Sequence, residues 1–149
     1  MERLMGLGIG YVIKLSYIRG MMPIQINLSL LEGEFSVCKV EDYSQTDVSR
    51  PFVFTASTDV EYSLVCPSGL VPGNTVARND GWRAFRIEGI LDFSLTGILS
   101  GISSVLAENS IGIFAVSSFN TDYILVRTSD LDKAINVLSR AGYYIKQPE

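Results

Sequence analysis

The sequence predicts an α+β fold in which β-strands and two helices alternate along the second half of the chain. Of the 149 residues, 47% are hydrophobic and 19% are charged, a balance typical of a chain that folds around a packed core. Several short runs alternate apolar with polar residues and are rich in Ile, Val, Phe and Tyr, as half-buried strands are. Two longer segments instead repeat apolar residues at helical spacing.

The first clear elements of the second half are a strand at 82–87 and a helix after it. Asp92 and Ser94 offer side-chain oxygens that suit a helix N-cap, and apolar residues within 95–106 share one helical face. We therefore expect the helix to begin near Leu95.

Residues 110–128 indicate two strands joined by a polar turn at 120–122. A second helix is expected from Ser129 to Gly142, because glycine commonly follows the end of a helix, and a last strand is expected at 143–145. The resulting order is β-α-β-β-α-β, which is the ferredoxin-like arrangement of an antiparallel sheet with two helices on one face.

The first half contains four shorter strand patterns and only weak helical patterns. The strand patterns at 24–31 and 35–40 indicate either a strand pair with a turn between them or one bent strand. Two more follow at 52–55 and 62–66, and a segment with prolines and glycines at 67–79 is interpreted as a linker. We interpret this half as a degenerate copy of the same ferredoxin-like unit.

These patterns divide the chain into three parts. Residues 21–72 form a first half and 80–146 form a second half. Residues 1–20 precede a methionine pair and are interpreted as an extension or a mis-called translation start. The apolar run at 4–13 is too short to span a bilayer, so we expect no membrane association.

Composition argues against several functional classes. The net charge of −4 and the lack of a Lys/Arg cluster argue against a nucleic-acid partner. The chain has no histidine, which is the commonest general base and the commonest metal ligand, and we expect neither a metal nor a cofactor. Cys38 and Cys66 lie in apolar strand patterns and are expected to be buried free thiols, which fits a reducing, cytoplasmic compartment.

The turn between the two strands of 110–128 gathers an unusual set of side chains. Ser117, Ser118, Phe119 and Asp122 place hydroxyls, an aromatic ring and a carboxylate in one corner. A generic hairpin needs turn-forming residues but not this set. If it faces a cleft, the corner suits a small polar ligand with a positive charge at one end.

Three passages carry a resemblance to a known family. They are the Phe-Ser-Leu-Thr-Gly-Ile loop at 93–98, the passage S-x-x-L-A-E-x-x-I-x-I-F at 103–114, and SSFNTDYILV at 117–126. Together they resemble the ACT domain. More narrowly, they resemble the tandem ACT proteins related to the regulatory domains of aspartate kinases and to the animal cytosolic arginine sensors. The resemblance extends over 24–145 and is strongest in the second half.

The resemblance implies a regulatory protein that binds an amino acid between two ACT-like units and catalyses no reaction. The family's ligand-holding aspartate matches Asp122, and its neighbours match Phe119 and Ser118, where we expect threonine in the family. The family's helix-opening loop matches 92–98, and its candidate ligand-binding residues are Asp92, Leu95, Thr96, Gly97 and Ile98. We also expect a homo-oligomer whose output passes through a partner protein.

The chemistry of an amino acid fits these positions. Asp122 offers an acceptor for the ammonium group, and the N–H groups at the helix start offer donors for the carboxylate. Each residue also has a structural interpretation: Asp122 caps its own turn, Asp92 caps the helix, Gly97 serves helix packing, and Phe119 lies in the core. The alternative function is an oligomerisation module that pairs through sheet edges or helices without a ligand.

Overall fold

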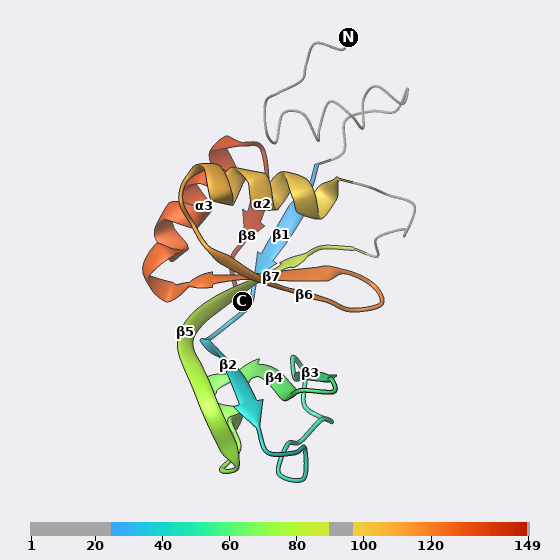
Figure 1. The fold of residues 1–149 in the computed structure, drawn as a ribbon. Coiled ribbons are helices and arrows are strands. Elements are labelled where there is room, and N and C mark those ends of the chain that lie inside the picture. Colours follow the sequence, from blue (N-terminus) through green and yellow to red (C-terminus); the bar gives the residue numbers. More distant parts are fainter. Residues whose placement is uncertain (1–24, 90–96, 149) are drawn as a thin grey trace.

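The computed structural model of the protein describes residues 25–89 and 97–148 (Figure 1). Within them, no helix is both long and apolar enough to cross a membrane. The elements in chain order are β1 Asn27–Leu30, β2 Phe35–Val40, β3 Phe54–Ser57, β4 Tyr62–Pro67, the 3-10 turn η2 Ser68–Leu70, β5 Thr75–Ile87, α2 Ile98–Glu108, β6 Ile113–Ser117, β7 Asp122–Arg127, the 3-10 turn η3 Thr128–Asp130, α3 Leu131–Arg140 and β8 Tyr144–Lys146. These elements confirm the predicted α+β class.

The long strand β5 runs through both parts of the molecule (Figure 1). Its 13 residues pair with β2 in their first part and with β1 and β7 in their second part. The sheet continues from β2 to β4 and β3, and from β7 to β6, so the strands of the described segments form one sheet. The linker predicted at 67–79 is wrong in its second part, because residues 75–79 belong to β5 and lie beside β2.

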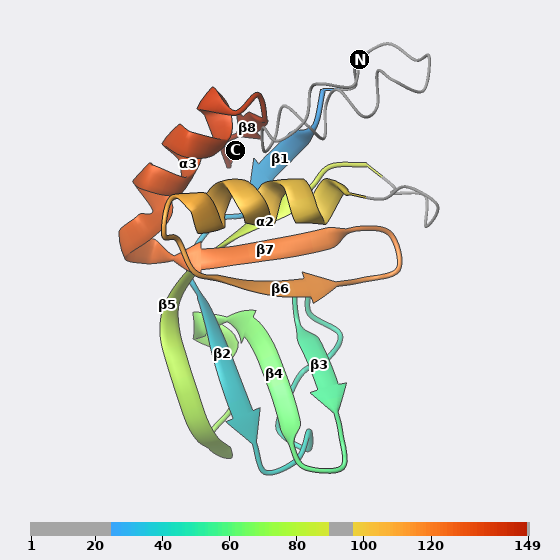
Figure 2. The same cartoon turned by 45° about the horizontal axis from the view of Figure 1, so that its top comes forward.

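The second half has the predicted order of elements, from β5 through α2, β6, β7 and α3 to β8, with both helices on one face of the sheet (Figure 2). A strand from the first half is inserted into it, since β1 lies between β5 and β8. Leu28 is the antiparallel partner of Ile87 and the parallel partner of Ile145. The predicted halves 21–72 and 80–146 thus share a sheet, and their division into two units stays a prediction.

β1 and β2 form one interrupted strand beside β5. Leu30 at the end of β1 is the partner of Phe85, and Phe35 at the start of β2 is the partner of Trp82. Between them, Gly33 adopts a φ of 79°, a left-handed conformation that suits glycine and interrupts the strand. The bent-strand alternative is therefore confirmed, and the pairing of the two segments with each other is wrong.

The main core lies between the two helices and the sheet. α2 contributes Ile102 and Leu106 and α3 contributes Ala134 and Leu138, at the i, i+4 spacing that places side chains on one face of a helix. The strands beneath supply these fully buried residues: Leu28, Phe85, Ile87, Ile124 and Val126. The side chains of Arg86 and Tyr123, which alternate with them along β5 and β7, therefore point to the other face of the sheet.

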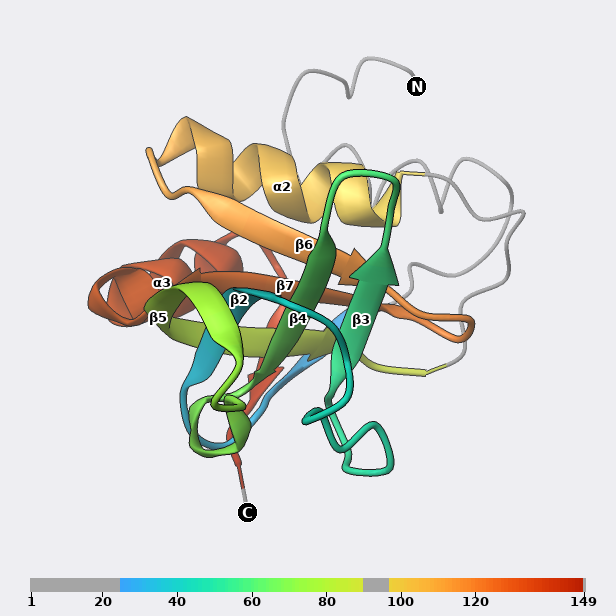
Figure 3. The same ribbon diagram turned by 60° about the horizontal axis from the view of Figure 1, so that its bottom comes forward.

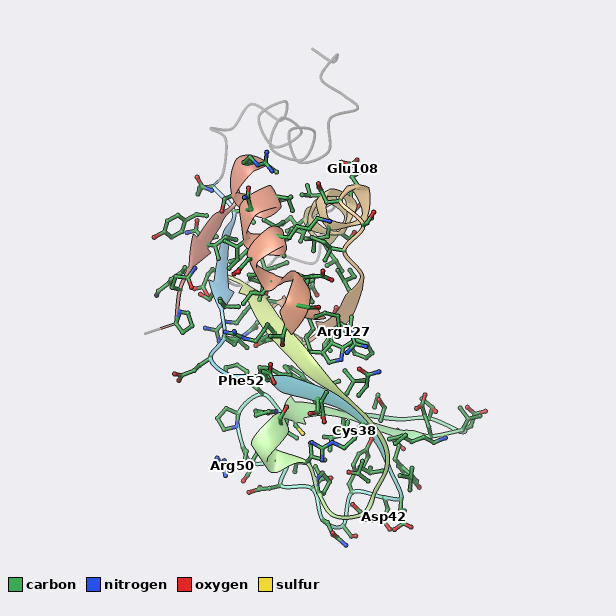
Figure 4. All side chains as sticks on the ribbon, turned by 90° about the vertical axis from the view of Figure 1, so that its left-hand side faces the viewer. Cys38, Asp42, Arg50, Phe52, Glu108 and Arg127 are labelled. Atoms are coloured by element: carbon green, nitrogen blue, oxygen red, sulfur yellow. The ribbon has the colours of Figure 1, made fainter. Side chains whose placement is uncertain are left out.

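That other face is covered by the first half, whose β2–β4–β3 layer lies against β5, β7 and β6 (Figure 2; Figure 3). Phe35, Val65 and Leu125 are buried in the cluster between the layers. The ring centre of Tyr123 lies 4.9 Å from that of Phe54 and 6.3 Å from that of Phe52. Figure 4 shows Phe52 at the junction between the two parts of the molecule.

The first half has strands but no α-helix within residues 25–75. Residues 41–53 connect β2 to β3 through turns, in which the carboxylates of Asp42 and Asp47 accept hydrogen bonds from the backbone N–H groups of Ser44 and Ser49. The connection from β4 to β5 contains only the short turn η2. This architecture is consistent with the degenerate ferredoxin-like half that the sequence predicts.

Both cysteines are free and buried, as the sequence predicts. Burial raises the pKa of the Cys38 thiol, and it raises the pKa of the Cys66 thiol from 9.0 to about 11. The neutral thiols therefore stabilise the folded state fully below about pH 9, and this contribution is lost as the pH rises through the folded-state pKa values.

We expect neither thiol to react with Ellman's reagent at about pH 8 while the protein is folded, because the thiolate is the reactive form. Both thiols should react once urea unfolds the chain. The absorbance of the released thionitrobenzoate counts the thiols that have reacted. Labelling of either thiol in the native protein as fast as labelling of free cysteine would show that these side chains are accessible.

Candidate functional site

The turn between β6 and β7 is closed by Ser118. The Ser118 hydroxyl donates to the carbonyl oxygen of Thr121 at 2.9 Å and accepts from the Thr121 backbone N–H at 3.4 Å, and the backbone N–H of Ser118 donates to the same carbonyl at 2.9 Å. Phe119 lies at the tip with 80% of its surface exposed, so its interpretation as a core residue is wrong. The Ser118 hydroxyl thus holds the corner in shape.

Asp122 is the first residue of β7 rather than a residue of the turn. Its partner across the hairpin is Ser117. Ile124 and Val126, which share its face of β7, are buried beneath the helices, so the Asp122 carboxylate points to the α2 side of the sheet. The register therefore places the hydroxyl of Ser117, rather than that of Ser118, across from Asp122.

Thr121 anchors the corner and is a residue that sequence reasoning missed. Its side chain is buried, and its hydroxyl donates to the carbonyl oxygen of Ile87 at 2.7 Å. Ile87 is the last residue of β5, so this bond fixes the hairpin corner beside the start of the connection to α2. Its position in a turn gives no periodic signal of burial, and only the tertiary contact shows its role.

Replacing Thr121 with Val should destabilise the protein by about 1–2 kcal/mol, because the buried carbonyl oxygen of Ile87 loses its donor while the side-chain shape is kept. Urea unfolding followed by circular dichroism measures the change. Asn120→Ala, at the exposed neighbouring position, is the matched control and should change stability by less than about 0.5 kcal/mol. Equal stability of the two variants would show that the bond to Ile87 does not anchor the corner.

Helix α2 begins at Ile98 with Gly97 as its N-cap residue. Gly97 has a φ of 87° and offers no side-chain oxygen, so the assignment of the N-cap to Asp92 or Ser94 is wrong. Gly97 supplies no side-chain cap, and the first-turn N–H groups and the positive end of the helix dipole favour an anion at this end of α2. The Ile98 side chain is apolar and packs against the core. The group that Ile98 offers to a polar ligand is therefore its backbone N–H.

The structure brings two of the predicted parts of the site to one end of the sheet. The start of α2 and the β6–β7 turn lie at the same end (Figure 2), and both the helix and the Asp122 carboxylate lie on the same face. N–H donors and a carboxylate acceptor therefore lie on one face and at one end of the sheet. The predicted ligand residues Asp92, Leu95 and Thr96 lie outside the described residues.

Comparison with known proteins identifies the family to which this fold belongs. Residues 77–140 match the ACT domain family. The crystal structure of the protein Atu0741 from Agrobacterium tumefaciens is similar to the chain, with 32% sequence identity and a TM-score of 0.75, and the match covers 85% of this chain and 96% of Atu0741. No curated protein matches the chain.

More distant structures share the fold. One is the aspartate kinase from Clostridium acetobutylicum, with 16% identity and a TM-score of 0.57 over 78% of this chain and 34% of that one. Another is the ligand-free regulatory subunit of aspartate kinase from Thermus thermophilus, with 8% identity and a TM-score of 0.56 over 76% and 95% of the two chains. The chain therefore belongs to the same family as Atu0741, and its second half carries an ACT domain with the fold of aspartate kinase regulatory domains.

Proposed function

We propose that this protein is a regulatory amino acid sensor whose ligand binds between the start of α2 and the β6–β7 corner. One observation carries the proposal: the start of α2 at Gly97 and the Asp122 carboxylate lie on the same face and at the same end of the sheet. Membership of the ACT family supports the same function. The corner is also fixed in place, since Thr121 bonds it to the end of β5.

In this proposal the two charged ends of the amino acid meet opposite partners. The carboxylate of the ligand accepts hydrogen bonds from the N–H groups at Gly97 and Ile98. The ammonium group donates to Asp122, with the Ser117 hydroxyl beside it. The remaining candidates from the sequence, namely Asp92, Leu95, Thr96, Ser118 and Phe119, would line the rest of the site.

The second wall of the site comes from a second copy of the chain in a homo-oligomer, because the first half lies against the opposite face of the sheet. Ligand binding then stabilises one arrangement of the units and shifts the population presented to a partner protein. This role needs no catalysis and suits the cytoplasm, where free amino acids are regulatory signals.

A thermal-shift screen of the standard amino acids tests the proposal. A ligand at 100 times its Kd should stabilise the protein by about 2.7 kcal/mol, because it binds only the folded state. At least one amino acid should raise the melting temperature in a concentration-dependent way. A flat response to every amino acid at millimolar concentration would overturn the sensing function.

The second candidate is an oligomerisation module without a ligand. The observation that favours it is strand β6, which among the described segments pairs only with β7 and leaves its outer edge open to another chain. Analytical ultracentrifugation together with the screen separates the two functions. A stable oligomer that responds to no amino acid would favour the module.

A further inference from the structure

A cavity of about 220 Å³ lies on the face of the sheet opposite the helices, away from the proposed amino acid site. Its lining comes from β1 and the residues after it, from Arg86 of β5, and from Lys146 and the residues that follow β8. Ser29, Arg86 and Lys146 alternate along their strands with core residues that face the helices, so their side chains point to this opposite face.

Three of the lining residues form a row across neighbouring strands. Ser29 of β1 is the register partner of Arg86 on one side and of Lys146 on the other. Cross-strand partners have Cβ atoms about 5 Å apart, so the two cationic side chains flank one hydroxyl. Ser29 itself is largely buried, with 8% of its surface exposed. The row places two positive charges and a hydroxyl at the base of an open cavity.

The guanidinium of Arg86 is held in position from two sides. Its Nε lies 3.5 Å from a carboxylate oxygen of Glu88, and its central carbon lies 5.9 Å from the centre of the Phe52 ring. The Ser29 hydroxyl donates to the same Glu88 oxygen. Within residues 25–89 and 97–148, Glu88 pairs with the guanidinium through Nε rather than through the two Nη nitrogens. An arginine that is positioned in advance binds a planar oxyanion with little loss of side-chain freedom.

We propose that this cavity binds a small oxyanion, the carboxylate or phosphate group of a metabolite, through Arg86 and Lys146. Arginine suits this role because its N–H groups match the geometry of both anions. The cavity is smaller than the roughly 300–1,000 Å³ of sites for drug-sized ligands, which restricts the ligand to a small molecule. Glu32 lines the same cavity, and its negative charge weakens the attraction for either anion.

Titration of the ¹⁵N-labelled protein with sodium acetate or inorganic phosphate tests this site, with sodium chloride at matched ionic strength as the reference. We expect saturable changes at the amides of Ser29, Arg86 and Lys146. Saturation with acetate alone assigns a carboxylate site, and saturation with phosphate alone assigns a phosphate site. No saturable change up to about 100 mM of either anion, or the same changes with chloride, would overturn the proposal.

Arg86→Gln should weaken binding of the active anion at least about tenfold, because it removes the charged donor. Arg78→Gln is the matched control, since Arg78 lies on the same strand and pairs with Asp80 at the same spacing in sequence, 3.0 Å away. The affinity of Arg78→Gln for the same anion should equal that of the wild type. Unchanged affinity in Arg86→Gln would overturn the assignment.

Arg86→Gln does not fold if the amide signals of its ¹⁵N–¹H spectrum lose their dispersion. In that case Lys146→Gln tests the same row at an exposed position and should weaken binding several-fold. Unchanged binding in this variant would then contradict the proposal. Because the amides of Gly97 and Asp122 report the amino acid site separately, failure of the oxyanion site leaves the proposed sensing function testable, and the reverse also holds.

Discussion

Replacing Asp122 with Asn should weaken amino acid binding by roughly ten- to hundredfold, because a hydrogen bond to a charged group contributes about 1.5–3 kcal/mol. The amide keeps the size of the side chain but loses the negative charge that attracts the ammonium group of the ligand. Isothermal titration with the amino acid identified by the thermal-shift screen measures the change in Kd.

The matched control for this variant is Asp132→Asn, in the first turn of α3. It removes the same charge at an exposed position away from the proposed site, so it should leave the Kd unchanged. If Asp122→Asn binds as tightly as Asp132→Asn, the Asp122 carboxylate is not the ammonium acceptor. The sensing function would then remain, at a site elsewhere on the protein.

Replacing Phe85 with Ala should destabilise the protein by about 3–5 kcal/mol, the typical result of deleting a buried aromatic ring from a packed core. Phe85 is fully buried on β5, where Leu30 and Ile124 are its partners on either side. The loss is a large part of the roughly 5–15 kcal/mol that stabilises an ordinary domain. Urea unfolding followed by circular dichroism measures it.

Val76→Ala provides the control, because Val76 lies on the same strand with 56% of its surface exposed. It should change stability by less than about 0.5 kcal/mol. Since β5 belongs to both parts of the sheet, Phe85→Ala should also unfold in one transition. The fluorescence of Trp82, the only tryptophan, should therefore follow the circular dichroism signal. Similar stability of the two variants, or two separate transitions, would contradict the central role of β5.

The local elements of the second half were predictable because their periodicity is strong. Residues 82–87, the main part of α2 and the two strands of the hairpin all appear where apolar spacing places them. The position of β1 was not predictable, because a strand pattern indicates that a segment pairs but does not name its partner. The contact of Leu28 with Ile145 joins residues far apart in sequence, and no local signal specifies it.

The candidate site shows the same division between local and tertiary information. Turn chemistry and the family resemblance drew attention to Asp122 and Gly97, but the face to which Asp122 points follows only from the burial of its neighbours on β7. Thr121 gave no signal because its role depends on the carbonyl group of Ile87, on another strand. The family resemblance matches Ser118 to a position in the ligand site, but the Ser118 hydroxyl bonds within the turn.

The central claim is that an amino acid binds between the start of α2 and the β6–β7 corner. The most direct test is a ¹⁵N–¹H spectrum of the protein recorded during titration with the amino acid that stabilises it most. The amides of Gly97, Ile98, Ser117 and Asp122 should shift together and saturate at one Kd. Changes confined to other parts of the protein, or no change at saturating ligand, would contradict the claim.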